Sequence, residues 1–172
     1  ALPYARDKHR GQLRKVLWVK TEIPYIYHPL TMACQALAMG IEDDDVLSTI
    51  LLHDVYEDCG VTLDELPCNE RVRNAVKLLS HNSYPEKASD LYYAGIAADS
   101  LASLVKCIDR CHNLSSMALG FTRNRIVGYV NETEKYIIPI LANLSKLDSS
   151  YSNAQWLLKY QMYSLLEMAK IL

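Results

Sequence analysis

The stretch from Leu47 to Asp58 constrains the fold most, because an apolar run ends there in ionisable residues. Its first part predicts a buried helix, and its last six positions include His53, Asp54, Glu57 and Asp58. Burying such groups costs free energy unless partners compensate for the lost hydration. Residues four apart share one face of a helix, so His53 should stack with Glu57 and Asp54 with Asp58. The stretch therefore predicts one patch of imidazole and carboxylate groups, which is a typical site for a metal ion and water.

The rest of the chain predicts an all-α protein. Its 172 residues include only six glycines and six prolines, and alternating runs typical of strands are scarce. The apolar periodicity predicts helices at 2–15, 29–39, 42–58, 69–80, 85–98, 100–117, 125–147 and 151–172, with loops at 16–28 and 81–85. Because no repeat or long linker divides these segments, we expect residues 1–172 to form a single domain.

Composition argues against several classes of function. A net charge of −2 gives no strong attraction to nucleic acid or to a membrane surface. The sequence lacks a long uncharged apolar segment, so we expect no membrane span. Five cysteines without a Cys-x-x-Cys pair indicate reduced thiols in a cytoplasmic protein. Cys107 and Cys111 share a helical face, where packing in the core is favoured over metal binding.

Two more positions offer the side chains that such a metal patch needs. Asp109 lies at the edge of the apolar stripe of the helix at 100–117, and His28 precedes a proline at a helix start. Each has a simpler explanation by itself, since Asp109 could pair with Arg110 or His112, and His28 could be a hydrogen-bonded structural residue. In chain order, however, His28, His53-Asp54 and Asp109 form the pattern H…HD…D.

This ordered pattern resembles that of the HD-domain metal phosphohydrolases, which are all-helical. Four segments narrow the resemblance to the hydrolase domain of the RelA/SpoT proteins and its small stand-alone members: Lys8–Lys15, Pro24–Pro29, Leu51–Asp58 and Asp109–Leu114. The resemblance covers about residues 4 to 140, and the Glu57-Asp58 pair is its most specific part. It implies that residues 1–172 form a single HD-domain helical fold.

The resemblance also implies a metal centre and a catalytic pair. The expected metal ligands are His28, His53, Asp54 and Asp109. The family implies Mn²⁺, and a mixed nitrogen and oxygen donor set also suits Fe²⁺ or Co²⁺. Glu57 and Asp58 are expected to orient the attacking water and to carry protons. The alternative for this pair, a solvated helix end, is disfavoured because negative charge there opposes the helix dipole.

Further residues resemble the nucleotide contacts of the family: Arg14, Lys15, Asn113, Arg125 and Tyr129. For the last two, a solvated arginine and a core tyrosine explain the sequence nearly as well. Lys106 and Arg110 could be solvated charges on the flank of their helix, and Arg110 could instead pair with Asp109.

The predicted activity is removal of the 3′-pyrophosphate of the alarmone (p)ppGpp, a small-molecule nucleotide. Two features leave room for another substrate, such as a nucleoside monophosphate or NADPH. Ser115 stands where the family often has arginine, and residues 81–100 match the family poorly. A metal-binding nucleotide sensor without turnover is a third hypothesis. The last helix carries Trp156, Tyr160 and Tyr163, which could pack internally or form a homo-oligomer.

Overall fold

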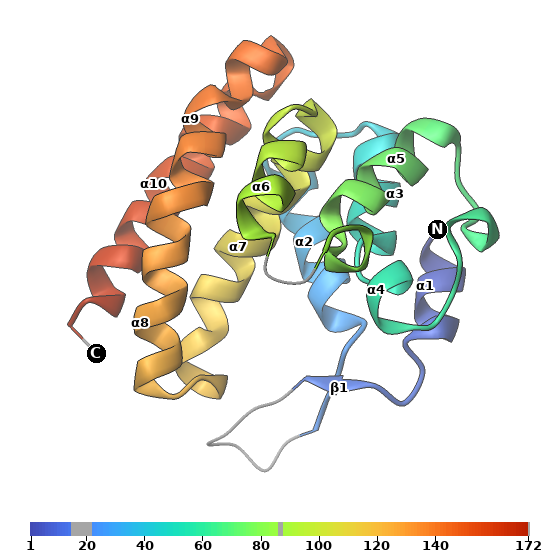
Figure 1. Ribbon diagram of the computed structural model, residues 1–172, viewed down its shortest axis with the longest axis horizontal. Helices are drawn as coiled ribbons and strands as arrows, with labels where there is room; N and C mark the ends of the chain where they lie inside the picture. The colour runs from blue at the N-terminus through green and yellow to red at the C-terminus, as the bar shows by residue number, and fades with distance from the viewer. Residues whose placement is uncertain (15–21, 86–87, 172) are drawn as a thin grey trace.

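The protein is described from a computed structural model that defines residues 1–14, 22–85 and 88–171 (Figure 1). The elements follow in chain order: α1 (Leu2–Lys8), β1 (Leu13–Arg14), β2 (Ile23–Pro24), α2 (Tyr27–Ala38), α3 (Asp44–Leu52), α4 (Val55–Asp58), η1 (Leu63–Glu65), α5 (Glu70–Leu79), η2 (His81–Ser83), α6 (Ser89–Ala97), α7 (Ser100–Gly120), α8 (Arg123–Glu132), η3 (Thr133–Ile137), α9 (Ile138–Leu147), η4 (Ser149–Tyr151) and α10 (Ser152–Ala169). The predicted all-α class is confirmed. Within the defined ranges, the sheet consists of β1 and β2 alone, paired antiparallel.

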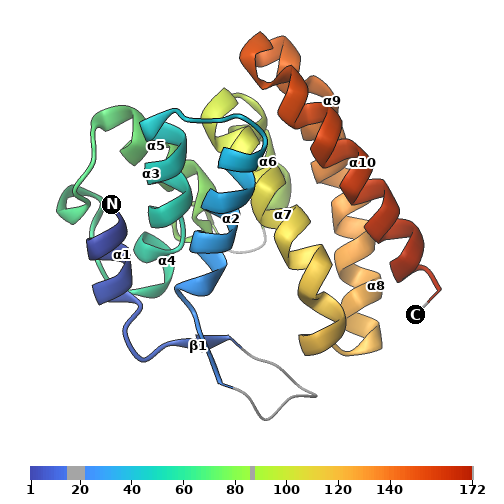
Figure 2. The same ribbon diagram turned by 180° about the vertical axis from the view of Figure 1, so that it is seen from behind.

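Helix α7 organises the fold. It lies in the middle of the molecule and packs against α2, α3, α5, α6, α9 and α10 (Figures 1 and 2). Helices α9 and α10 run antiparallel on one side, whereas α1 and α4 lie on the opposite side. The predicted inward positions of α7 are all buried: Leu101, Leu104, Val105 and Ile108. Any residue at the middle of α7 is therefore enclosed by neighbouring helices.

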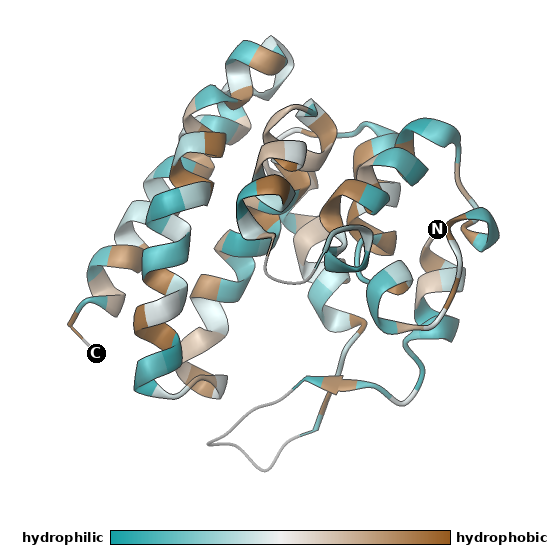
Figure 3. Cartoon of the chain, in the orientation of Figure 1, coloured by the Kyte–Doolittle hydropathy of each residue, from teal (hydrophilic) through white to brown (hydrophobic). Residues whose placement is uncertain are grey.

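Two apolar clusters hold the helices together. The larger cluster joins α2, α3 and α5 to α6–α10, and the smaller one joins α1 and α4 to α3 and α5. Helices α3 and α5 contribute to both. In Figure 3, hydrophobic and hydrophilic residues alternate along α8 and α9, as expected for helices with one buried side.

The predicted helix at 2–15 is wrong beyond Lys8. Gly11 has a φ of 79°, a left-handed conformation that glycine adopts without steric cost and that a helix cannot continue through. The chain then turns, and Leu13 and Arg14 pair with Pro24 and Ile23. The predicted loop at 16–28 is partly wrong as well, because α2 already begins at Tyr27. Residues 16–21 of that loop lie outside the described residues.

The predicted helix at 42–58 is broken at His53 and Asp54. In a continuous helix, the Ile50 carbonyl would accept the backbone N–H of the fourth residue along. Here it accepts the His53 side chain, at 2.7 Å from Nδ1. Helix α3 ends at Leu52, and the short α4 begins at Val55. Helical hydrogen bonding resumes at Asp54, whose carbonyl accepts the Asp58 backbone N–H at 2.8 Å.

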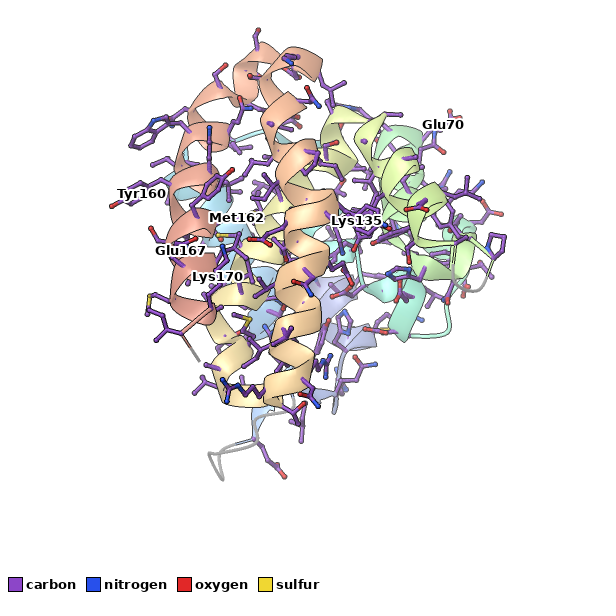
Figure 4. All side chains as sticks on the ribbon, turned by 60° about the vertical axis from the view of Figure 1, so that its left-hand side comes forward. Glu70, Lys135, Tyr160, Met162, Glu167 and Lys170 are labelled. Carbon is purple, nitrogen blue, oxygen red and sulfur yellow. The ribbon has the colours of Figure 1, made fainter. Side chains whose placement is uncertain are left out.

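The C-terminal third forms two long helical segments, as predicted. Helices α8 and α9 join through the π-turn η3, and α10 returns beside them. Figure 4 shows Tyr160 projecting from the outer side of α10, whereas Met162 lies on the side that faces the other helices. Tyr160 is 69% exposed and Met162 is fully buried.

The prediction that Arg110 is solvated is wrong. Its side chain is buried in α7 and donates to the Tyr93 hydroxyl of α6, the Thr133 hydroxyl of η3 and the Glu132 carboxylate of α8. Its guanidinium also lies 3.8 Å from the centre of the Tyr129 ring. Arg110 thus connects the central helix to α6, α8 and η3.

No single helix among the described residues is long and apolar enough to cross a membrane. Helices α6 and α7 meet the combined requirement of length and apolar composition only as a pair, and they are bent by 118° where they meet.

Core packing predicts that two leucines of α9 contribute unequally to the free energy of unfolding. Leu144 is fully buried and Leu147 is 43% exposed. Leu144→Ala should lower the free energy of unfolding by about 2–5 kcal/mol, because it leaves a cavity. Leu147→Ala should change it by about 0.5 kcal/mol or less. Urea unfolding measures both, and equal losses would contradict this description of the core.

Candidate metal centre

The four predicted ligands converge from three elements. His28 lies in the first turn of α2, His53 and Asp54 form the turn between α3 and α4, and Asp109 lies in α7. The Nε2 atom of His28 is 3.3 Å from Asp109 Oδ1 and 3.7 Å from Asp54 Oδ2. The Nε2 atom of His53 is 3.0 Å from Asp54 Oδ2. Residues far apart in the sequence thus place two imidazoles and two carboxylates around one point.

This donor set fits a divalent cation. Ligand atoms of His28, His53 and Asp109 all lie within 4.8 Å of one another. Among the described residues, the buried Nε2 of His53 makes no well-aligned hydrogen bond, although Asp54 Oδ2 lies 3.0 Å away. Its Nδ1 donates to the Ile50 carbonyl, which orients the ring and directs Nε2 towards the carboxylates. A buried nitrogen left without a partner is costly, and a bound cation would satisfy it.

The two carboxylates keep their charge in spite of burial. Burial raises the pKa of Asp109, but the neighbouring Lys106 ammonium and His28 more than reverse this, so the pKa lies well below its usual range. Burial likewise opposes ionisation of Asp54, and His53 holds that pKa below its usual range. Lys106 is only 13% exposed and lies 3.1 Å from Asp109 Oδ2, so its predicted place as a solvated flank charge is wrong.

The two ligand histidines differ in protonation. Burial lowers the pKa of His28, and the Asp109 carboxylate only partly offsets this. Burial also opposes the charged form of His53, but the Asp54 and Asp109 carboxylates outweigh it and raise the pKa to about 9. A cation that binds here must therefore displace a proton from His53.

An open cleft lies beside His28. It measures about 230 Å³ and is lined by Arg14, Ile23, Tyr27, His28, Thr31, His112, Asn113, Ser116, Met117, Leu119, Gly120 and Phe121. Arg14 donates to the Asn113 side-chain oxygen at 2.9 Å, and Asn113 donates to Asp109 Oδ1 at 2.6 Å. The cleft is therefore lined by apolar residues, such as Met117 and Phe121, and by polar residues, of which Asn113 contacts the ligand Asp109.

Of the predicted nucleotide contacts, Arg14 and Asn113 line this cleft. Arg125 lies over the ring of Phe121, a cleft residue, at 3.8 Å. Tyr129 packs edge-on against Phe121 and lies beneath Arg110, one layer behind the cleft. Lys15 falls outside the described residues.

The predicted catalytic pair lies on α4, directly after the ligand turn. The Glu57 carboxylate accepts the backbone N–H of His81 at 2.8 Å and therefore faces η2 rather than stacking beneath His53. Asp58 is exposed, and its pKa is raised by partial burial and by the charges of Asp54 and Glu57. The expected stacking of Glu57 on His53 is therefore wrong, whereas Asp58 lies one helical turn after Asp54, whose carbonyl accepts the Asp58 backbone N–H at 2.8 Å.

The sequence did not single out two residues that contact the ligands. Tyr25 donates its hydroxyl to Asp54, and His112 Nδ1 lies 2.9 Å from His28 Nδ1. Burial, together with His28 and Arg14, lowers the pKa of His112 to about 4. Tyr25 lies three residues before His28, and His112 lies three residues after Asp109. This closeness in sequence to a ligand was the signal that could have identified them.

Comparison with known proteins places the chain in a family, although no family model matches it. It is 31% identical to the guanosine-3′,5′-bis(diphosphate) 3′-pyrophosphohydrolase MESH1 of Xenopus tropicalis over 140 residues, which cover 75% of this chain and 76% of that protein. The chain belongs to the family of the guanosine-3′,5′-bis(diphosphate) 3′-pyrophosphohydrolases of RelA/SpoT type. The MESH1 protein of Mus musculus matches with the same identity and coverage.

Longer members of the family match too. The Aquifex aeolicus guanosine-3′,5′-bis(diphosphate) 3′-pyrophosphohydrolase is 27% identical over 168 residues, which cover 93% of this chain. The chain spans only 23% of that protein and 17% of the matching SpoT of Escherichia coli.

A solved structure supports the same family fold. It is described as a metazoan ortholog of SpoT that hydrolyses ppGpp, with a TM-score of 0.76 and 25% identity. The match covers 99% of this chain and 94% of that one. The RelA/SpoT resemblance inferred from the sequence is confirmed.

Protonation of His53 predicts that cation binding depends on pH. Because its pKa is raised to about 9, binding between about pH 6.5 and pH 9 releases one proton, and affinity should rise about tenfold per pH unit. Titration with Mn²⁺, followed by electron paramagnetic resonance, measures this slope. His53→Ala should bind weakly at every pH, and a flat wild-type profile would contradict the assignment.

Proposed function

We propose that the chain is a metal-dependent phosphohydrolase that removes the 3′-pyrophosphate of (p)ppGpp. The products would be GDP or GTP and pyrophosphate. The observation that carries this proposal is the convergence of His28, His53, Asp54 and Asp109 beside a cleft that Arg14 and Asn113 line. The relatives named for this activity give it further support.

We further propose Mn²⁺ as the cation held by these four residues. Two imidazoles and two carboxylates, without a thiolate, suit a cation that keeps open positions for water and substrate. Fe²⁺ and Co²⁺ suit the same donors. A bound divalent cation would supply Lewis acidity, which activates water and offsets charge on the attacked phosphate.

The proposed chemistry needs groups that move protons. Water attacks the phosphorus attached to the 3′ oxygen, a new P–O bond forms, and the bond from that phosphorus to the 3′ oxygen breaks. The water must lose a proton, and the 3′ oxygen must gain one. Glu57 and Asp58 are the proposed carriers, and the raised pKa of Asp58 suits a carboxylate that takes up and releases a proton.

The cleft supplies the remaining contacts. The Arg14 guanidinium lines the cleft, donates to Asn113 and supplies a positive charge for phosphate. It would contact the nucleotide, together with Asn113, Lys15, Arg125 and Tyr129. The apolar side, including Met117 and Phe121, would accept the flat surface of a base.

Product analysis tests both the metal and the reaction. Metal-free protein incubated with ppGpp should yield GDP and pyrophosphate only after Mn²⁺ is added, as ion-exchange chromatography would show. Asp54→Asn should abolish turnover, because it removes a ligand charge. Asp90→Asn is the matched control, since Asp90 is 83% exposed and lies on α6.

Turnover by the Asp54→Asn variant would contradict the mechanism. Turnover of a nucleoside monophosphate or NADPH instead of ppGpp would keep the metal chemistry and replace the substrate. Tight ppGpp binding without product in excess Mn²⁺ would favour a sensor.

The acid pair should affect catalysis without affecting metal binding. Glu57→Gln and Asp58→Asn should each lower kcat by about 10²–10⁴-fold, the usual contribution of a positioned acid or base. Mn²⁺ affinity should stay unchanged, because neither residue is a proposed ligand. Glu167→Gln, on the exposed side of α10, is the control. Unchanged kcat in both site variants would remove the pair from the mechanism.

A further inference from the structure

We propose that His112 is a positioning residue that holds the metal ligand His28 in the tautomer needed for cation binding. The inference rests on the proposed metal site, but not on the identity of the substrate. His112 lies on α7, three residues after Asp109, and its side chain lines the cleft beside His28. Its Nδ1 atom contacts both the metal ligand His28 and the proposed substrate contact Arg14.

The donor and acceptor roles follow from Arg14. A guanidinium only donates hydrogen bonds. Arg14 Nη1 lies 3.2 Å from His112 Nδ1, so this Nδ1 must be the acceptor and carries no proton. The same Nδ1 lies 2.9 Å from His28 Nδ1. The proton in that second contact must therefore belong to His28.

A proton on Nδ1 of His28 leaves its Nε2 free to bind a cation. This Nε2 is the atom that faces Asp109 and Asp54, at 3.3 and 3.7 Å. Metal-binding histidines commonly donate their second nitrogen to a neighbouring group that fixes the tautomer and the ring orientation. His53 uses the Ile50 carbonyl in this way, and His28 uses the His112 imidazole.

The arrangement also joins the metal site to the cleft. Arg14, on β1, is held by His112 and by Asn113, and Asn113 binds Asp109. One chain of contacts therefore runs from Arg14 through His112 to His28. A second runs from Arg14 through Asn113 to Asp109. Displacing the His112 ring would remove the Nδ1 partner of His28 and one of the two contacts that hold Arg14.

Two substitutions separate this role from simple packing. The His112→Asn variant would present a side-chain oxygen near the position of Nδ1 and so keep an acceptor. His112→Phe fills a similar volume without an acceptor. Mn²⁺ affinity, measured without substrate, should fall about 10–100-fold in His112→Phe, the usual loss when such a supporting group is removed. In His112→Asn it should stay close to that of the wild type.

The opposite order, with His112→Phe binding Mn²⁺ normally and His112→Asn binding weakly, would assign packing to His112 and overturn the proposal. Nitrogen-15 NMR of the wild-type, metal-free protein gives a second test that needs no variant to fold. His28 should be protonated at Nδ1, and protonation at Nε2 alone would also overturn the proposal. Because neither measurement uses ppGpp, failure to hydrolyse that substrate would not affect the outcome.

Discussion

The site depends on two carboxylates that stay charged inside the protein. Asp109 lies in the central helix, where neighbouring elements remove most of its contact with water. An isolated ionised group there would be neutralised by a shift in its pKa. Lys106 and Asn113 instead give it a neighbouring positive charge and hydrogen-bond donors. Asp54 receives similar support from His53 and Tyr25. Together these contacts maintain the negative charge that a divalent cation requires.

The break between α3 and α4 places the ligands His53 and Asp54 in a turn, apart from Glu57 and Asp58 on α4. Because the Ile50 carbonyl accepts the His53 side chain, His53 and Asp54 occupy a turn and reach inwards together. On α4, Glu57 reaches η2, whereas Asp58 lies one helical turn after the ligand Asp54. The hairpin strand β1 brings Arg14 to the other side of the ligands. The metal ligands, the acid pair and the cationic contact thus come from different local structures.

Periodicity predicted the helices well where a helix buries one regular stripe, as α5 and α7 do. It failed where a local event interrupted the pattern: the left-handed Gly11 ended α1, and the His53 side chain ended α3. Among the site residues, the sequence order identified four that the fold brings together. It did not identify Tyr25 or His112, because their importance lies in contacts with residues 29 and 84 positions away.

The sequence by itself determined the all-α class and the types of side chain that meet at the site, since periodicity and residue chemistry are properties of short segments. Only the tertiary structure decided which of those side chains are neighbours. Lys106 and Arg110 show the difference: both are cations on one helix, yet one pairs with Asp109 and the other with Glu132. The direction of each side chain depends on the helix packed against it, and a linear pattern does not contain that information.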